Sequence, residues 1–160
     1  MTGPVPVRES VIQAVVARLS AVTVGDRAVP VHRARRKEVP EHDLPAIILH
    51  TSPGVSEPLC AGVTRCRERL RVEAQMRVVA ETADADTDAA LDTALVALES
   101  AVRAALESDE TLGGVAVTLT HTDADQTAAD GTGLGPLGAI LAAYDVEYWH
   151  VTGDPFTAAP

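Results

Sequence analysis

A row of arginines at alternate positions has the clearest chemical potential in this sequence. It consists of Arg65, Arg67, Arg69, Arg71 and Arg77. A guanidinium is planar and permanently charged, and its fork of N–H donors matches carboxylates and phosphates. Such a row suits a solvated surface, a contact with an acidic protein surface, or nucleic-acid binding. Nucleic acid is the least favoured, because the row has no aromatic residues for base stacking and the chain is acidic overall.

Histidines and cysteines are the other side chains that could do chemistry. The histidines are His32, His42, His50, His121 and His150. A metal site needs three or four converging ligands with supporting hydrogen bonds, and the spacing of these histidines selects no such set. Cys60 and Cys66 could supply a nucleophile or a disulfide, but nothing in their spacing selects either use. We therefore predict two free thiols.

Motifs of the common enzyme classes are missing. The sequence has no GxxxxGK[ST] phosphate loop, no GxSxG elbow, no HExxH and no CxxC pair. The glycines of residues 131–138 do not follow dinucleotide-binding spacing. Asp84, Asp86 and Asp88 lack the glycine and the closing glutamate of a calcium loop, so they are assigned to the start of a helix. We predict that the chain is not an enzyme and binds no cofactor or metal.

The arginine row is expected to lie on a long β-strand. Over residues 65–79 the odd positions are mostly charged, and from Leu70 onward the even positions are apolar. This alternation predicts one buried face and one basic face. The strand would span roughly 50 Å at about 3.3 Å per residue, which is longer than usual. Its first part is therefore expected to project as one arm of a hairpin.

Two amphipathic helices are predicted. Residues 7–22 carry Val, Ile and Leu at helical spacing, and residues 86–108 carry a more regular stripe. The second stripe consists of Leu91, Leu95, Leu98, Val102 and Leu106. Further strands are expected at 27–35, 45–51, 115–121 and 137–151. Loops are expected at 52–62 and at 122–136, and the part of the second loop over 123–136 is expected to be mobile in the free subunit.

These elements predict an α+β fold in the order α-β-β-β-α-β-β. We expect a mostly antiparallel sheet of about five strands, with two helices packed on one face. With 160 residues, the chain suits one domain, placed at residues 1–155, followed by a flexible tail at 156–160. No apolar run is long enough to span a bilayer, so no membrane partner is expected.

Charge is distributed unevenly along the chain. Residues 1–80 hold twelve basic and eight acidic residues, for a net +4, whereas residues 81–160 hold one basic residue and fifteen acids, for −14. The two values add to the net charge of −10. This split favours head-to-tail association of identical copies, or else reflects acids that solvate a helix and a loop.

The whole pattern resembles the phage tail terminator proteins, including the minor tail protein U family. The resemblance covers residues 7–155 and rests on sequence patterns of helices and strands, not on catalytic signatures. These are LPAIILHT, ERLRVEAQMRVVAE, LDTALVALESAVRAALESD, LGGVAVTLT and AAYDVEYWHVTGDP. The loops at 52–63 and 123–136 are the expected departures from the family pattern.

This resemblance implies a structural protein of the virion tail, in the neck region, assembled in the host bacterial cytoplasm. Six copies would form a ring that caps the tail tube, ends its growth and joins the head connector. DNA would pass through the ring without sequence readout, and the arginine row would form a protein interface. The alternatives are another head–tail connector or tail completion protein, or a small regulatory ligand-binding domain. The last of these would need a pocket with converging polar groups.

Overall fold

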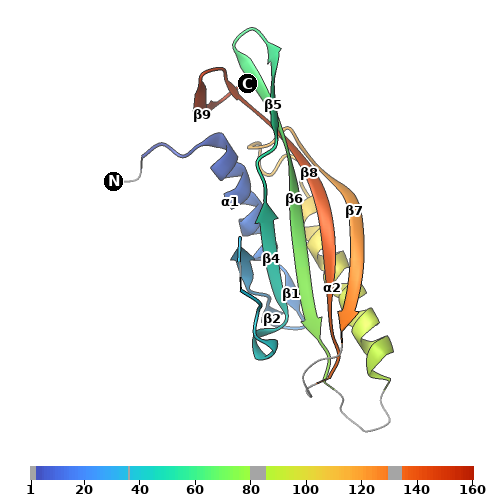
Figure 1. The fold of residues 1–160 in the computed structure, drawn as a ribbon. Helices are drawn as coiled ribbons and strands as arrows, with labels where there is room; N and C mark the ends of the chain where they lie inside the picture. Colours follow the sequence, from blue (N-terminus) through green and yellow to red (C-terminus); the bar gives the residue numbers. More distant parts are fainter. Residues whose placement is uncertain (1–2, 36, 80–85, 130–134) are drawn as a thin grey trace.

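A long antiparallel sheet forms the centre of the computed structural model, which describes residues 3–35, 37–79, 86–129 and 135–160 (Figure 1). The helices are α1 (Val7–Leu19), the short 3-10 helix η1 (Glu41–Asp43) and α2 (Thr87–Glu107). The strands are β1 (Thr23–Val24), β2 (Arg27–Ala28), β3 (Val31–Arg33), β4 (Ala46–Thr51), β5 (Val55–Cys60), β6 (Val63–Arg77), β7 (Thr118–Ala129), β8 (Leu137–Val151) and β9 (Asp154–Ala158).

The main sheet has the strand order β3-β4-β6-β8-β7, with β5 also paired to β6 and β9 to β8. Strands β3 and β4 are parallel and the other described pairs are antiparallel. The longest ladder joins β6 to β8, from Val63 opposite Val151 to Arg77 opposite Leu137. The predicted α+β class with a mostly antiparallel sheet is confirmed, but the described residues contribute seven strands to this sheet, more than the five or so expected.

Both α-helices pack on one face of the sheet. The apolar stripe predicted for the second helix is confirmed, since all five of its residues are buried on α2. The buried side of α1 and the inward side chains of β4, β6 and β8 complete the same core. Asp86 caps α2 by accepting a hydrogen bond from the Ala89 N–H at 3.0 Å, as its position before the stripe indicates. None of the described helices is long and apolar enough to cross a membrane.

Strand β6 alternates as predicted, and its first part projects as an arm. The even residues from Cys66 to Met76 are buried, whereas Arg67, Arg69 and Arg71 are exposed. The predicted loop at 52–62 is wrong in part, because Val55–Cys60 forms strand β5 along β6. The loop was predicted because Pro58 lacks a backbone N–H. An edge strand tolerates proline, however, because only one side of it needs hydrogen-bond donors. Figure 1 shows this hairpin extending beyond the ends of both α-helices.

The loop predicted at 122–136 is wrong in its first part, which belongs to strand β7. Residues 118–129 pair with β8, with a register shift between His121 and Asp123. From Thr122 to Ala128 the side chains are exposed, so the sequence carries no apolar alternation there. Pairing depends instead on the backbone of β8, which the local sequence does not reveal. The predicted loop is therefore wrong over 122–129, the expected mobility of 123–136 stays a prediction, and residues 130–134 lie outside the described residues.

Two smaller differences concern the ends of strands. The strand predicted at 27–35 is divided into β2 and β3, because Pro30 lies between them and lacks an N–H. Asp154–Ala158 was expected to lie largely in a flexible tail, but it forms strand β9 against the end of β8. Both differences place short polar segments at the margins of the sheet.

Candidate interaction surface

The five predicted arginines all lie at odd positions of β6, on the face opposite the α-helices. Their neighbours on β8 are also odd residues, with Arg67 opposite Glu147 and Arg69 opposite Asp145. The term arginine face is used here for Arg65, Arg67, Arg69, Arg71 and Arg77. The alternation of a single strand is sufficient to bring these residues to one surface, as predicted.

Most of the arginine face is neutralised within the chain. Arg67 Nε donates to Glu147 at 2.9 Å, and Arg69 Nε donates to Asp145 at 3.0 Å. Arg65 pairs with Glu57 of the adjacent β5 at 2.5 Å. The alternation of β6 alone predicted a basic face, whereas β5 and β8 of the same chain supply three carboxylates to it. The face is therefore a mixed-charge surface that can exchange partners.

These ion pairs shift the pKa values of their side chains. The hydrogen bond to Glu147 raises the pKa of Arg67, and the bond to Asp145 raises the pKa of Arg69. Burial opposes ionisation of Glu147, but hydrogen bonds from Arg67 and Trp149 outweigh it and hold the pKa of this carboxyl below its ordinary value. The Arg67–Glu147 pair thus stays charged at neutral pH.

Arg71 and Arg77 differ from the other three arginines. Arg71 is exposed and makes no ion pair with any residue that the structure describes. Arg77 approaches Glu41 at 3.8 Å, and its side chain is only 16% exposed. The region of Glu41 covers this end of the sheet face, where Val39, Ala46 and Ile48 form a second small apolar cluster. Arg77 is therefore not available to a partner on the open part of the arginine face.

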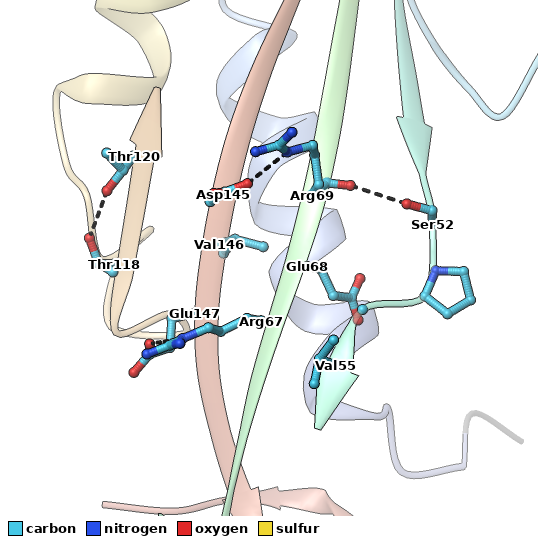
Figure 2. A pocket seen from close by; sticks show the side chains of 12 residues that line it. Ser52, Val55, Arg67, Glu68, Arg69, Thr118, Thr120, Asp145, Val146 and Glu147 are labelled. Atoms are coloured by element: carbon cyan, nitrogen blue, oxygen red, sulfur yellow. Dashed lines mark hydrogen bonds and ion pairs between the residues drawn. The ribbon is translucent and has the colours of Figure 1, made fainter. Parts of the chain in front are cut away.

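A shallow groove of about 500 Å³ crosses the open part of this face. Figure 2 shows the Arg67 and Arg69 side chains reaching along the sheet to Glu147 and Asp145, with Thr118 and Thr120 on the far side. The segment that joins β4 to β5 borders the other side of the groove. The charged groups that line the groove mainly bond one another. Few of its described polar groups are therefore left to bind a small molecule.

A buried polar cluster beneath this groove was missed by the sequence analysis. Glu68 is 6% exposed, and its Oε1 accepts hydrogen bonds from Arg8 Nε and from the Tyr148 hydroxyl, both at 2.7 Å. Burial and the bond to Glu68 raise the pKa of Tyr148, so it remains a hydrogen-bond donor. The sequence did contain an indication of this cluster, because Glu68 occupies an even position of β6, where the neighbouring side chains are buried. A buried carboxyl group needs hydrogen-bond partners. The cluster links α1, β6 and β8.

The histidines and cysteines contact other residue types in the described part of the chain. His50 Nε2 lies 2.9 Å from Glu73 Oε2, and the His121 ring packs edge-on against Tyr144 with centroids 5.2 Å apart. Cys60 and Cys66 are free, as predicted, and Cys66 is buried. Within the described ranges, no three His, Cys, Asp or Glu side chains are grouped closely enough to hold a metal ion.

Comparison with known proteins adds no assignment to this surface. No family model matches the chain, and no curated protein matches it.

Proposed function

We propose that this chain is a structural subunit of a phage-type tail. It forms a ring, most simply of six copies, at the head-proximal end of the tail tube, where it ends tube growth and provides the surface for joining the head. DNA passes through the ring without being read. The motifs over residues 7–155 support this proposal by their resemblance to the tail terminator family.

The observation that carries the proposal is a sheet with both α-helices on one side and most of the opposite face open. The opposite face bears exposed, charged and mutually paired side chains around Arg67 and Arg69. Such a surface suits contacts between proteins, because salt bridges at a surface can exchange partners at little net cost. We propose that this open face, with Arg65, Arg67, Arg69 and Arg71, contacts the tube protein or the head connector.

Two alternative functions differ from this proposal in the molecule that the chain would bind. Another connector or tail completion protein would share the ring but bind a different neighbour. A regulatory ligand-binding domain would use the groove of about 500 Å³ over β6 and β8. The internal pairing of Arg67 and Arg69 disfavours a ligand there, because a bound anion would have to displace Glu147 and Asp145.

Tube assembly in vitro tests the proposed function. The tube protein encoded in the same genome is polymerised with and without this chain, and tube lengths are measured by electron microscopy. We expect long tubes of variable length without the chain, and shorter tubes with a ring at one end when it is added. Tubes of unchanged length with no ring at either end would refute the proposal.

The double substitution Arg69→Glu and Arg71→Glu tests the role of the arginine face in the same assay. Both side chains are exposed, so we expect an unchanged circular dichroism spectrum but a loss of tube capping. Arg103→Glu is the matched control, since Arg103 is an exposed arginine on α2, on the other side of the sheet. If the double variant caps tubes as well as the control does, the arginine face is only a solvated surface.

A further inference from the structure

One edge of the main sheet is basic. Residues 27–37 around β3 include five basic residues and no acid. Within this stretch Arg33 is paired with Glu9 at 2.6 Å. Arg27 and Lys37 are exposed and make no ion pair with any described residue, and Arg35 bonds only backbone carbonyls of Lys37 and Glu38. Arg27 lies on β2, just before β3, and Arg35 and Lys37 follow β3; this set is called the basic edge.

The opposite edge is acidic. It is formed by β7 and by the start of α2, which are joined by a hydrogen bond of 2.9 Å from Gln126 to Asp92. Four exposed carboxylates there make no ion pair with any residue in the described part of the chain. This set, Asp88, Asp92, Asp123 and Asp125, is called the acidic edge. Arg69 attracts Asp123 at a distance, but the like charges along this edge still repel one another, so a cationic partner would stabilise this surface.

The two edge strands, β3 and β7, lie at the same level in the sheet. Following the strand pairing across the sheet, His32 is opposite Ile48, then Glu73, then Leu141, and finally Asp125. The centre of β3 and the centre of β7 therefore end the same row of residues. Five strands spaced about 4.8 Å apart separate the two edges by roughly 19 Å, so they cannot meet within one chain.

Both edges also have free backbone groups. In the described part of the chain β3 pairs only with β4, and β7 pairs only with β8. An unpaired strand edge is a template for another strand. Strand β3 runs antiparallel to β7, so copies placed side by side with the same orientation would bring these two edges together as an antiparallel pair.

We propose that copies of this chain join side by side, with the acidic edge of one copy against the basic edge of the next and β3 beside β7. The contact is heterologous, and repetition of a heterologous contact closes into a ring when the rotation permits. The occupant of each edge is thus a second copy of the chain. The inference rests on the proposed function for the closure into a ring, but not for the pairing of the edges.

Lys37 makes the proposal directly testable, because it is the only lysine in the chain. The wild-type protein is treated with a carbodiimide, which joins amines to carboxylates without a spacer, in low salt at high protein concentration. A mixture of ¹⁴N- and ¹⁵N-labelled protein distinguishes links between copies from links within one copy. We expect dimers and larger species in which Lys37 is joined to the acidic edge, and a loss of these species in high salt. Species in which Lys37 is joined only to other acids, or the absence of crosslinked dimers, would overturn the proposal.

Charge reversal sharpens the test. One variant carries Asp88→Arg, Asp123→Arg and Asp125→Arg, and the other carries Arg27→Glu and Arg35→Glu, so both variants keep Lys37 for the crosslinking reaction. Each variant alone presents two edges of like charge, so we expect at least about tenfold fewer crosslinked dimers than in wild type. An equal mixture restores attraction at both edges of alternating copies, so dimers should return. A mixture that remains as poorly crosslinked as the separate variants would show that the edges do not meet.

This experiment needs no tail tube, so it is independent of the capping assay. Edge-to-edge crosslinks together with uncapped tubes would refute the proposed function and retain the lateral contact. Capped tubes without these crosslinks would retain the proposed function and refute the lateral contact.

Discussion

The two halves of β6 follow the same alternating pattern but lie in different surroundings. From Leu70 to Met76 the even side chains are covered by α1 and α2. Over Val63–Arg67 the strand is flanked by β5 and β8 in the arm. Strand β5, which is described in full, has no buried residue, and the same holds for β9. Alternation of side chains thus determines which face can be buried, and coverage by another layer determines whether it is.

Glu68 lies at the boundary between these halves. Its hydrogen bonds to Arg8 and Tyr148 tie the first turn of α1 to both central strands where the apolar core ends. The comparison predicts that side chains of the covered half determine global stability. Side chains of the arm should determine local order and contacts with partners.

The largest effect is expected for Leu70→Ala, which removes a side chain that is 1% exposed in the covered half. Loss of buried area and the resulting cavity should lower the free energy of unfolding by about 2–5 kcal/mol. Leu59→Ala is the matched control in the arm, where Leu59 is 38% exposed, and should cost less than about 1 kcal/mol. Urea unfolding followed by circular dichroism measures both. Equal losses in the two variants would mean that the arm belongs to the core.

An intermediate effect is expected for Glu68→Ala at the boundary. The Tyr148 hydroxyl would lose its acceptor in a buried position, which should cost about 1–3 kcal/mol. Arg8 contributes less to this cost because its side chain is 38% exposed and can be solvated. Glu68→Gln keeps an acceptor oxygen and should retain most of the stability, as measured by the same urea titration. A loss in the glutamine variant as large as in the alanine variant would show that charge, and not hydrogen bonding, is the stabilising factor.

The smallest global effect is expected for Gly54→Ala, at the passage from β4 to β5. A Cβ at this position would overlap the carbonyl oxygen of Arg67, so β5 must move away from β6. Because β5 buries little surface, we expect faster amide exchange over 55–60, with a midpoint of unfolding close to that of wild type. Trp149, the single tryptophan, lies on β8 in the arm and reports local change by its fluorescence. Unchanged exchange over 55–60 would contradict this account of the glycine.

The local sequence was sufficient for the elements with strong periodicity. The stripe of α2 and the alternation of β6 predicted two buried faces and the arginine row. Their extent was predicted to within a few residues, because apolar side chains recur with the period of the element that buries them. The exposed charge of Arg69 and Arg71 and the free thiols were likewise available from the sequence.

Tertiary structure alone decided the pairing of the polar strands and of the charges. Strands β5, β7 and β9 carry little apolar alternation, and they form because β6 and β8 offer unpaired backbone groups beside them. Arg67 and Glu147 are 80 residues apart in sequence, as are Glu68 and Tyr148, and only the register of β6 against β8 brings them into contact. The registers across the whole sheet likewise place β3 and β7 at the ends of one row. Periodicity is a local property of the chain, whereas register and pairing depend on which distant backbone and charged groups the fold brings together.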